Sequence, residues 1–253
     1  EVDAAVEPQN RLIWYRRWDW SLPRFVPLYA AIHLTIQGTL STLVYRGCLR
    51  FAEWRGDAGQ LYAQWELAIP FIPAMVVPYL SVYLLFVGTF FVCRSARELM
   101  TLSLRLLSGL LVSAASFCLL PLQSGFVRPQ VAGFYGELFR VIDANDAPFN
   151  MAPSLHVTTT VILAATLAAH SRRWLRGLLM GWCGLIVAST AFTWQHHLID
   201  IATGLLLGAG CVRLIRPTAA PASACGVESS TDVLRGRLRS PVVGASCPAA
   251  EAQ

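Results

Sequence analysis

The chain has 253 residues, of which 55% are hydrophobic and 14% are charged, and its mean hydropathy is +0.51. This composition is too apolar for an ordinary soluble domain and indicates a membrane protein. All 20 basic residues are arginine, and we attribute the net charge of +5 to membrane topology, so we expect a bilayer and no nucleic acid as partner.

The predicted elements begin with residues 1–24, where tryptophans and arginines mix as in a cytoplasmic or interfacial segment. Apolar stretches of about 20 residues then predict transmembrane helices, six in number and forming one bundle. They cover residues 25–45, 71–93, 101–122, 153–171, 175–194 and 198–215. Residues 25–216 are therefore expected to form one all-α membrane domain. Residues 217–253 are small, polar and proline-containing, which predicts a disordered cytoplasmic tail.

Arginines are concentrated on one side of the six predicted spans, and loops rich in arginine tend to stay in the cytoplasm. This asymmetry predicts a multi-pass protein of the cytoplasmic membrane with both termini cytoplasmic. The loop 123–152 and the span ends next to it then lie on the outer, periplasmic face.

Three polar stretches converge on that face, at residues 124–130, 152–157 and 189–200. His196 and Asp200 are four residues apart, so on a helix they share a face, and the carboxylate can hold the imidazole in one tautomer. A histidine held in this way is a candidate nucleophile. His156 could give a proton to a leaving oxygen.

The second stretch, APSLHV, also suits a phosphate group. Pro153 is favourable at a first helical position, and the N–H groups of Ser154, Leu155 and His156 would then point toward an anion at the helix N-terminus. Arg128 adds a planar set of donors for phosphate oxygens. The seven cysteines form no ligand-like cluster, so we expect phosphoryl-group chemistry that needs neither a metal nor another cofactor.

These motifs resemble the type 2 phosphatidic acid phosphatase superfamily, whose signature is Lys-x6-Arg-Pro, Pro-Ser-Gly-His and Ser-Arg-x5-His-x3-Asp. The matching residues here are Arg128-Pro129, Pro153-Ser154-x-His156 and Ser189-x6-His196-x3-Asp200. The resemblance implies a general acid at His156, a nucleophile at His196 that forms a phosphohistidine, and an orienting carboxylate at Asp200. It also implies phosphate contacts from Arg128, Ser154, Leu155 and Ser189.

The chain departs from this signature at three positions. Pro121 stands where the superfamily has lysine, Leu155 where it has glycine and Thr190 where it has arginine. The Pro-Ser-Leu-His form is similar to the branch that includes inositol phosphorylceramide synthases. Because the loop 123–152 places the site at the outer water boundary and shows no obvious pocket for a second headgroup, the sequence nevertheless predicts hydrolysis of a lipid phosphomonoester or pyrophosphate. A lipid headgroup phosphotransferase and a catalytically silent lipid-binding membrane protein remain the alternatives.

Overall fold

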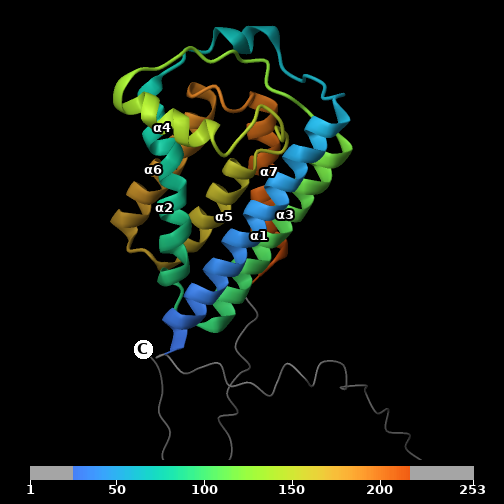
Figure 1. The fold of residues 1–253 in the computed structure, drawn as a ribbon. Coiled ribbons are helices and arrows are strands. Elements are labelled where there is room, and N and C mark those ends of the chain that lie inside the picture. Colours follow the sequence, from blue (N-terminus) through green and yellow to red (C-terminus); the bar gives the residue numbers. More distant parts are fainter. Residues whose placement is uncertain (1–24, 217–253) are drawn as a thin grey trace, which may run out of the picture. The chain divides into compact units, whose positions relative to one another are not determined.

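The computed structural model describes residues 25–216 (Figure 1). The predicted interfacial segment 1–24 and the predicted tail 217–253 lie outside the described residues. The described part is helical, with a single isolated β-bridge between Gly59 and Leu122, which confirms the all-α prediction at the level of fold class.

Seven α-helices and two short 3-10 helices make up this part of the chain. In order they are α1 Val26–Arg55, η3 Gln64–Ala68, η4 Pro73–Met75, α2 Val76–Val92, α3 Ala96–Leu119, α4 Gly133–Asp143, α5 Leu155–His170, α6 Arg173–Phe192 and α7 Leu198–Leu214. Six of the seven α-helices overlap the six predicted spans, and the seventh, α4, lies in the region 123–152 that was predicted to be a loop.

Three of the described helical segments are long and apolar enough to cross a membrane: Pro73–Val92, Ala96–Leu119 and Arg173–Phe192. The helix α5 is apolar but shorter, with 16 residues. The membrane character of the protein is thus supported by three helices, and a total of six spans stays a prediction.

The first helix extends ten residues beyond the predicted end at residue 45. The extension contains four charged residues, which lowered its hydropathy, but Cys48, Leu49 and Ala52 on one of its faces are buried against the bundle. The helix ends where Gly56 adopts a left-handed conformation with φ of 67° and donates its N–H to the Ala52 carbonyl at 3.1 Å.

The helix α5 lies in the middle of the bundle, packed against α7 and α6 and also against α2 and α3 (Figure 1). Glycines allow its close approach to α7. A Cβ atom at Gly204 would lie 2.7 Å from the Ser154 carbonyl oxygen, and one at Gly208 would lie 2.8 Å from Cβ of Val161. The close contact matters for the site because α5 carries His156 and α7 carries Asp200.

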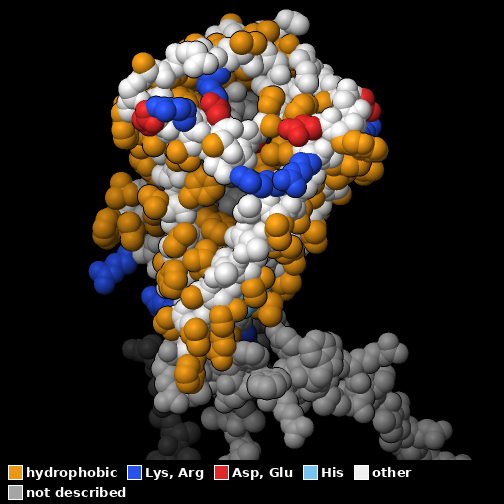
Figure 2. Space-filling view, in the orientation of Figure 1, with side chains coloured by type: hydrophobic (Ala, Val, Ile, Leu, Met, Phe, Trp, Pro, Cys, Tyr) orange, Lys and Arg blue, Asp and Glu red, His pale blue; other side chains and the backbone are white. Residues whose placement is uncertain are grey.

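The longer connecting segments gather at one end of the bundle, together with η3 and α4, whereas the short α2–α3 and α5–α6 connections lie at the other end (Figure 1). Figure 2 shows hydrophobic side chains along the sides of the bundle and charged side chains around a hollow at the end that carries α4. The polar stretches identified in the sequence therefore lie together at this end.

Candidate active site

His196 lies in the tight turn between α6 and α7. The Thr190 carbonyl accepts hydrogen bonds from the N–H groups of Gln195 and His196, at 3.0 and 3.1 Å. Trp194 has a positive φ of 56°, which is uncommon for a bulky residue, and its indole N–H donates to the Ile69 carbonyl at 2.9 Å. These bonds fix the backbone position of His196 and maintain a strained conformation next to it.

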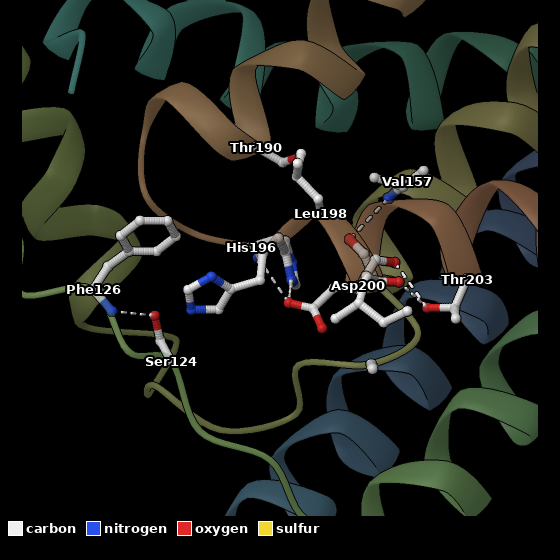
Figure 3. A network of polar contacts seen from close by, with 12 residues as sticks. Ser124, Phe126, Val157, Thr190, His196, Leu198, Asp200 and Thr203 are labelled. Carbon is white, nitrogen blue, oxygen red and sulfur yellow. Dashed lines mark hydrogen bonds and ion pairs between the residues drawn. The ribbon is translucent and has the colours of Figure 1, made fainter. Parts of the chain in front are cut away.

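The His196 side chain lies next to Asp200, as Figure 3 shows. Their Nδ1 and Oδ2 atoms are 3.6 Å apart, an ion-pair distance that is too long for a hydrogen bond; Asp200 is buried, and the His196 side chain is 11% exposed. The carboxylate favours a proton on Nδ1, which leaves the lone pair of Nε2 available for attack on phosphorus.

The reason for this proximity differs from the predicted one. His196 precedes α7, so the two residues do not share a helical face. Instead His197 is extended as the N-cap of α7, and its backbone N–H donates to Asp200 Oδ2 at 2.9 Å. The same carboxylate therefore caps the helix and faces His196.

His156 lies in the first turn of α5, with its ring stacked on Tyr79 at a centroid distance of 4.0 Å. Its Nε2 atom is 2.9 Å from the Tyr79 carbonyl oxygen, which can only accept, so Nε2 carries a proton. The remaining ring nitrogen, Nδ1, is then the one that could exchange a proton with a substrate.

The start of α5 is displaced from the predicted position. The helix begins at Leu155 rather than at Pro153, because Ser154 acts as the N-cap and its hydroxyl accepts the Val157 N–H at 3.3 Å. The Ser154 N–H donates to the Asp200 carbonyl at 3.0 Å. Ser154 thus joins α5 to α7, and its own N–H is already paired.

Arg128 lies at the polar end of the bundle, where its guanidinium group forms an ion pair with Asp143 and lies 4.7 Å from the centre of the Phe139 ring. The Asp143 carboxylate neutralises part of the positive charge that Arg128 was expected to offer to a phosphate group. Arg128 can contact a phosphate only in competition with Asp143 or by binding both groups.

Ser189 is the predicted site residue that the structure leaves apart from the others. It is fully buried within α6, and its hydroxyl donates to the Ile186 carbonyl at 2.6 Å. It contributes to neither of the two cavities described below. This geometry offers no support for phosphate contact by Ser189.

Two cavities meet at His196. The inner cavity, of about 740 Å³, lies between α1, α2, α3 and α5 and is lined by Leu155 and His156. The outer cavity, of about 480 Å³, is lined by Arg128 and by residues of α4. Four residues line both cavities and thus form the neck between them: Tyr45, Ile142, Asp146 and His196.

The sequence interpretation missed a second buried cluster, around Glu66 and His197. The His197 ring lies between Tyr62 and Phe126, at centroid distances of 4.4 and 4.2 Å, and its Nε2 atom accepts the Gly125 N–H at 3.0 Å. Its Nδ1 atom is 3.3 Å from Glu66 Oε2. Burial lowers the pKa of His197 despite the nearby carboxylates, which keeps the ring neutral and structural.

Glu66 itself receives the Leu198 N–H at 2.8 Å and thereby fixes the first residue of α7. A signal for this residue exists in the sequence, since it is the single charge between Asp57 and Arg94. An isolated carboxylate in an apolar stretch is costly and often functional.

Searches of protein-family models, of curated proteins and of solved structures each found no match to this chain. Among residues 25–216, no group of three or more His, Cys, Asp or Glu side chains is arranged to hold a metal ion. The site is therefore interpreted from its own geometry.

Proposed function

We propose that the protein is a membrane phosphohydrolase that cleaves a lipid phosphomonoester or pyrophosphate through a histidine nucleophile. The observation that carries this proposal is the His196–Asp200 pair at a cavity that also contains His156. A nucleophile, the carboxylate that orients it and a second histidine for proton transfer are the groups that phosphoryl transfer through a histidine requires.

In the first step, Nε2 of His196 attacks phosphorus, the bond from phosphorus to the leaving oxygen breaks, and His156 in its imidazolium form gives its Nδ1 proton to that oxygen. In the second step, water attacks the phosphohistidine, His156 takes a proton from the water, and the phosphorus–nitrogen bond breaks. Asp200 stabilises the positive charge on the His196 ring during both steps.

The inner cavity provides room for the lipid part of such a substrate. Its wall includes apolar side chains of three helices, such as Leu34, Val82 and Leu106, and its volume is within the range of small-molecule sites, about 300–1,000 Å³. The arginine asymmetry of the sequence favours a site at the outer face of the cytoplasmic membrane with both termini on the cytoplasmic side.

Transfer of the phosphoryl group to a second lipid or to a polyol is the other candidate function, and the outer cavity favours it. A volume of about 480 Å³ on the far side of His196 can hold a substituent larger than water. The acceptor that reaches phosphorus in line then decides between hydrolysis and transfer.

Product partition tests the proposal. Purified protein in detergent would receive radiolabelled phosphatidate, a polyprenyl pyrophosphate or phosphatidylinositol, each with and without diacylglycerol or ceramide, beside His196→Ala as control. We expect label in water-soluble inorganic phosphate. Label found only in a second lipid, and only with acceptor present, would identify a transferase. No product from any donor would favour the catalytically silent alternative.

A further inference from the structure

We propose that Asp146 binds the substrate phosphate as a neutral carboxylic acid, donating a hydrogen bond at the neck between the two cavities, and that Tyr45 orients it. This inference rests on the proposed function in that it places a phosphate beside His196. It assigns a phosphate-binding role to a residue outside the three motifs.

The position of Asp146 is the first reason. It follows α4 and lines both cavities, as His196 does, so a phosphate group next to His196 lies within reach of its carboxyl group. The other neck residues are the Tyr45 phenol and the apolar Ile142.

The hydrogen bonds of the carboxyl group are the second reason. Its Oδ1 atom accepts both the Tyr45 hydroxyl, at 2.5 Å, and the Ala147 N–H, at 2.9 Å. An oxygen that accepts two donors acts as the carbonyl oxygen of a carboxylic acid, so a proton on Asp146 resides on Oδ2. That O–H is then the group that can donate to a phosphate oxygen.

Asp146 is also held firmly in place. The segment after α4 is joined to α1 by the Tyr45 hydroxyl, by Arg46, which donates to Asn145 Oδ1 at 2.9 Å, and by the Asn150 side-chain amide, which donates to the Tyr45 carbonyl at 3.1 Å. Asn150 has a positive φ of 58° and is almost fully buried. A group fixed in this way loses little freedom when it binds a ligand.

Burial favours the neutral form of Asp146 and outweighs the groups that face it. The titratable groups facing Asp146 come from several elements, namely Tyr45 of α1, Tyr79 and Tyr83 of α2, Arg128 after α3 and His196 before α7. Burial is the largest influence and raises the pKa of Asp146, while the Tyr45 hydroxyl, His196 and Arg128 lower it by less. A bound phosphate anion would raise this pKa further.

The proposed role explains how a phosphate could bind where the nearby cations are engaged by other groups. Thr190 and Pro121 replace the two cations of the superfamily signature. Arg128 and Arg140 are paired with Asp143 and Glu137, and Arg46 donates to Asn145. A carboxylate in the neck would repel a phosphate, whereas a carboxylic acid supplies a donor without adding charge.

Binding can be measured without turnover by using a non-hydrolysable lipid phosphonate as the probe. Dissociation constants for the full chain in detergent would be determined between pH 5 and pH 9 for wild type, Asp146→Asn, Asp146→Ala and Tyr45→Phe. Asp57→Asn is the matched control, because this exposed carboxylate at the same end lines neither cavity. Thermal unfolding of each variant would verify the fold.

We expect Asp146→Asn to bind like wild type at pH 5 and at least about tenfold more tightly at pH 9, since the amide keeps a donor and cannot ionise. Titration of the probe is common to both proteins and cancels in their ratio. Asp146→Ala should bind about tenfold more weakly than Asp146→Asn at every pH. In Tyr45→Phe, binding should weaken at a higher pH than in wild type. The substitution removes a hydrogen bond that lowers the pKa of Asp146, so Asp146 stays protonated to a higher pH.

A ratio of wild type to Asp146→Asn that is constant with pH, equal binding by the Asn and Ala variants, or a wild type that does not bind the probe would each overturn the inference. The proposed function fails separately, if the phosphonate binds as expected but no lipid phosphate is turned over. Turnover that depends on His196 together with binding that ignores Asp146 would leave the function standing and remove the role of Asp146.

Discussion

Substitution of Gly204 by alanine should separate the two halves of the site. The new Cβ atom would lie 2.7 Å from the Ser154 carbonyl oxygen, 3.0 Å from Cβ of Val157 and 3.3 Å from Cβ of Ser154. An ordinary contact begins near 3.4 Å, so the start of α5 must retreat from α7 by about 0.7 Å. The retreat moves His156 away from Asp200, because these residues belong to the two helices that separate.

The expected loss follows from this displacement. A misplacement of about 1 Å can cost on the order of 100-fold in rate, so we expect kcat of Gly204→Ala to fall by at least about tenfold. Overpacking should also lower the free energy of unfolding by about 1–3 kcal/mol.

Gly210→Ala is the matched control, since it makes the same change on the same helix at a position where a Cβ atom meets nothing within 4 Å. The assay is phosphate release from the best lipid donor, with thermal unfolding in detergent measured in parallel. If Gly204→Ala retained the activity and the unfolding temperature of Gly210→Ala, the argument from close helix packing would be refuted.

Three further predictions concern topology, the nucleophile and metal. Cysteine placed at Gln130 in a cysteine-free background should react with a membrane-impermeant thiol reagent in intact cells or spheroplasts, because Gln130 lies beside the outer cavity; labelling only after lysis would reverse the orientation. His196→Ala should abolish turnover while Asp200→Asn leaves a small remainder, since the carboxylate only orients the ring and stabilises charge, and a folded His196→Ala with full activity would exclude the covalent mechanism. Chelation with EDTA should leave the rate unchanged, and a full loss restored by magnesium would contradict the assignment.

The sequence predicted the positions of six α-helices because each contains an apolar stretch, although only three helical segments among residues 25–216 are long and apolar enough to cross a membrane. It missed α4 since an amphipathic helix of 11 residues is too short to register as a span, although Phe139 and Ile142 are three residues apart and both buried. It ended the first helix too early because charged residues lowered the hydropathy over residues 46–55, while a buried face continued. Mean hydropathy alone therefore misplaces these helix ends, whereas the spacing of apolar residues along one helix face would have indicated both α4 and the extension of α1.

The candidate site was predictable only where its residues are close in the sequence. His196 and Asp200 are four positions apart, and this spacing predicted that they would meet, although they do so across the N-cap of α7 and not along a shared helical face. Glu66 contacts the start of α7 across 132 positions, and Tyr45 contacts Asp146 across 101, so no local pattern could pair them. Such contacts depend on how the helices pack, which local periodicity does not specify.

The long-range contacts also suggest a division of tasks within the site. The Glu66–His197 cluster fixes the start of α7 and thereby Asp200, while Tyr45 fixes the segment that carries Asp146. His196 lies between these two groups. It is bonded in sequence to His197 of the first cluster, and it faces Asp146 across the neck. Because the His197 ring is stacked between Tyr62 and Phe126 and its Nε2 lone pair already accepts the Gly125 N–H, it cannot substitute for His196 as nucleophile, even though it is adjacent in sequence. Under the proposed function, one of the two consecutive histidines reacts and the other holds it in position.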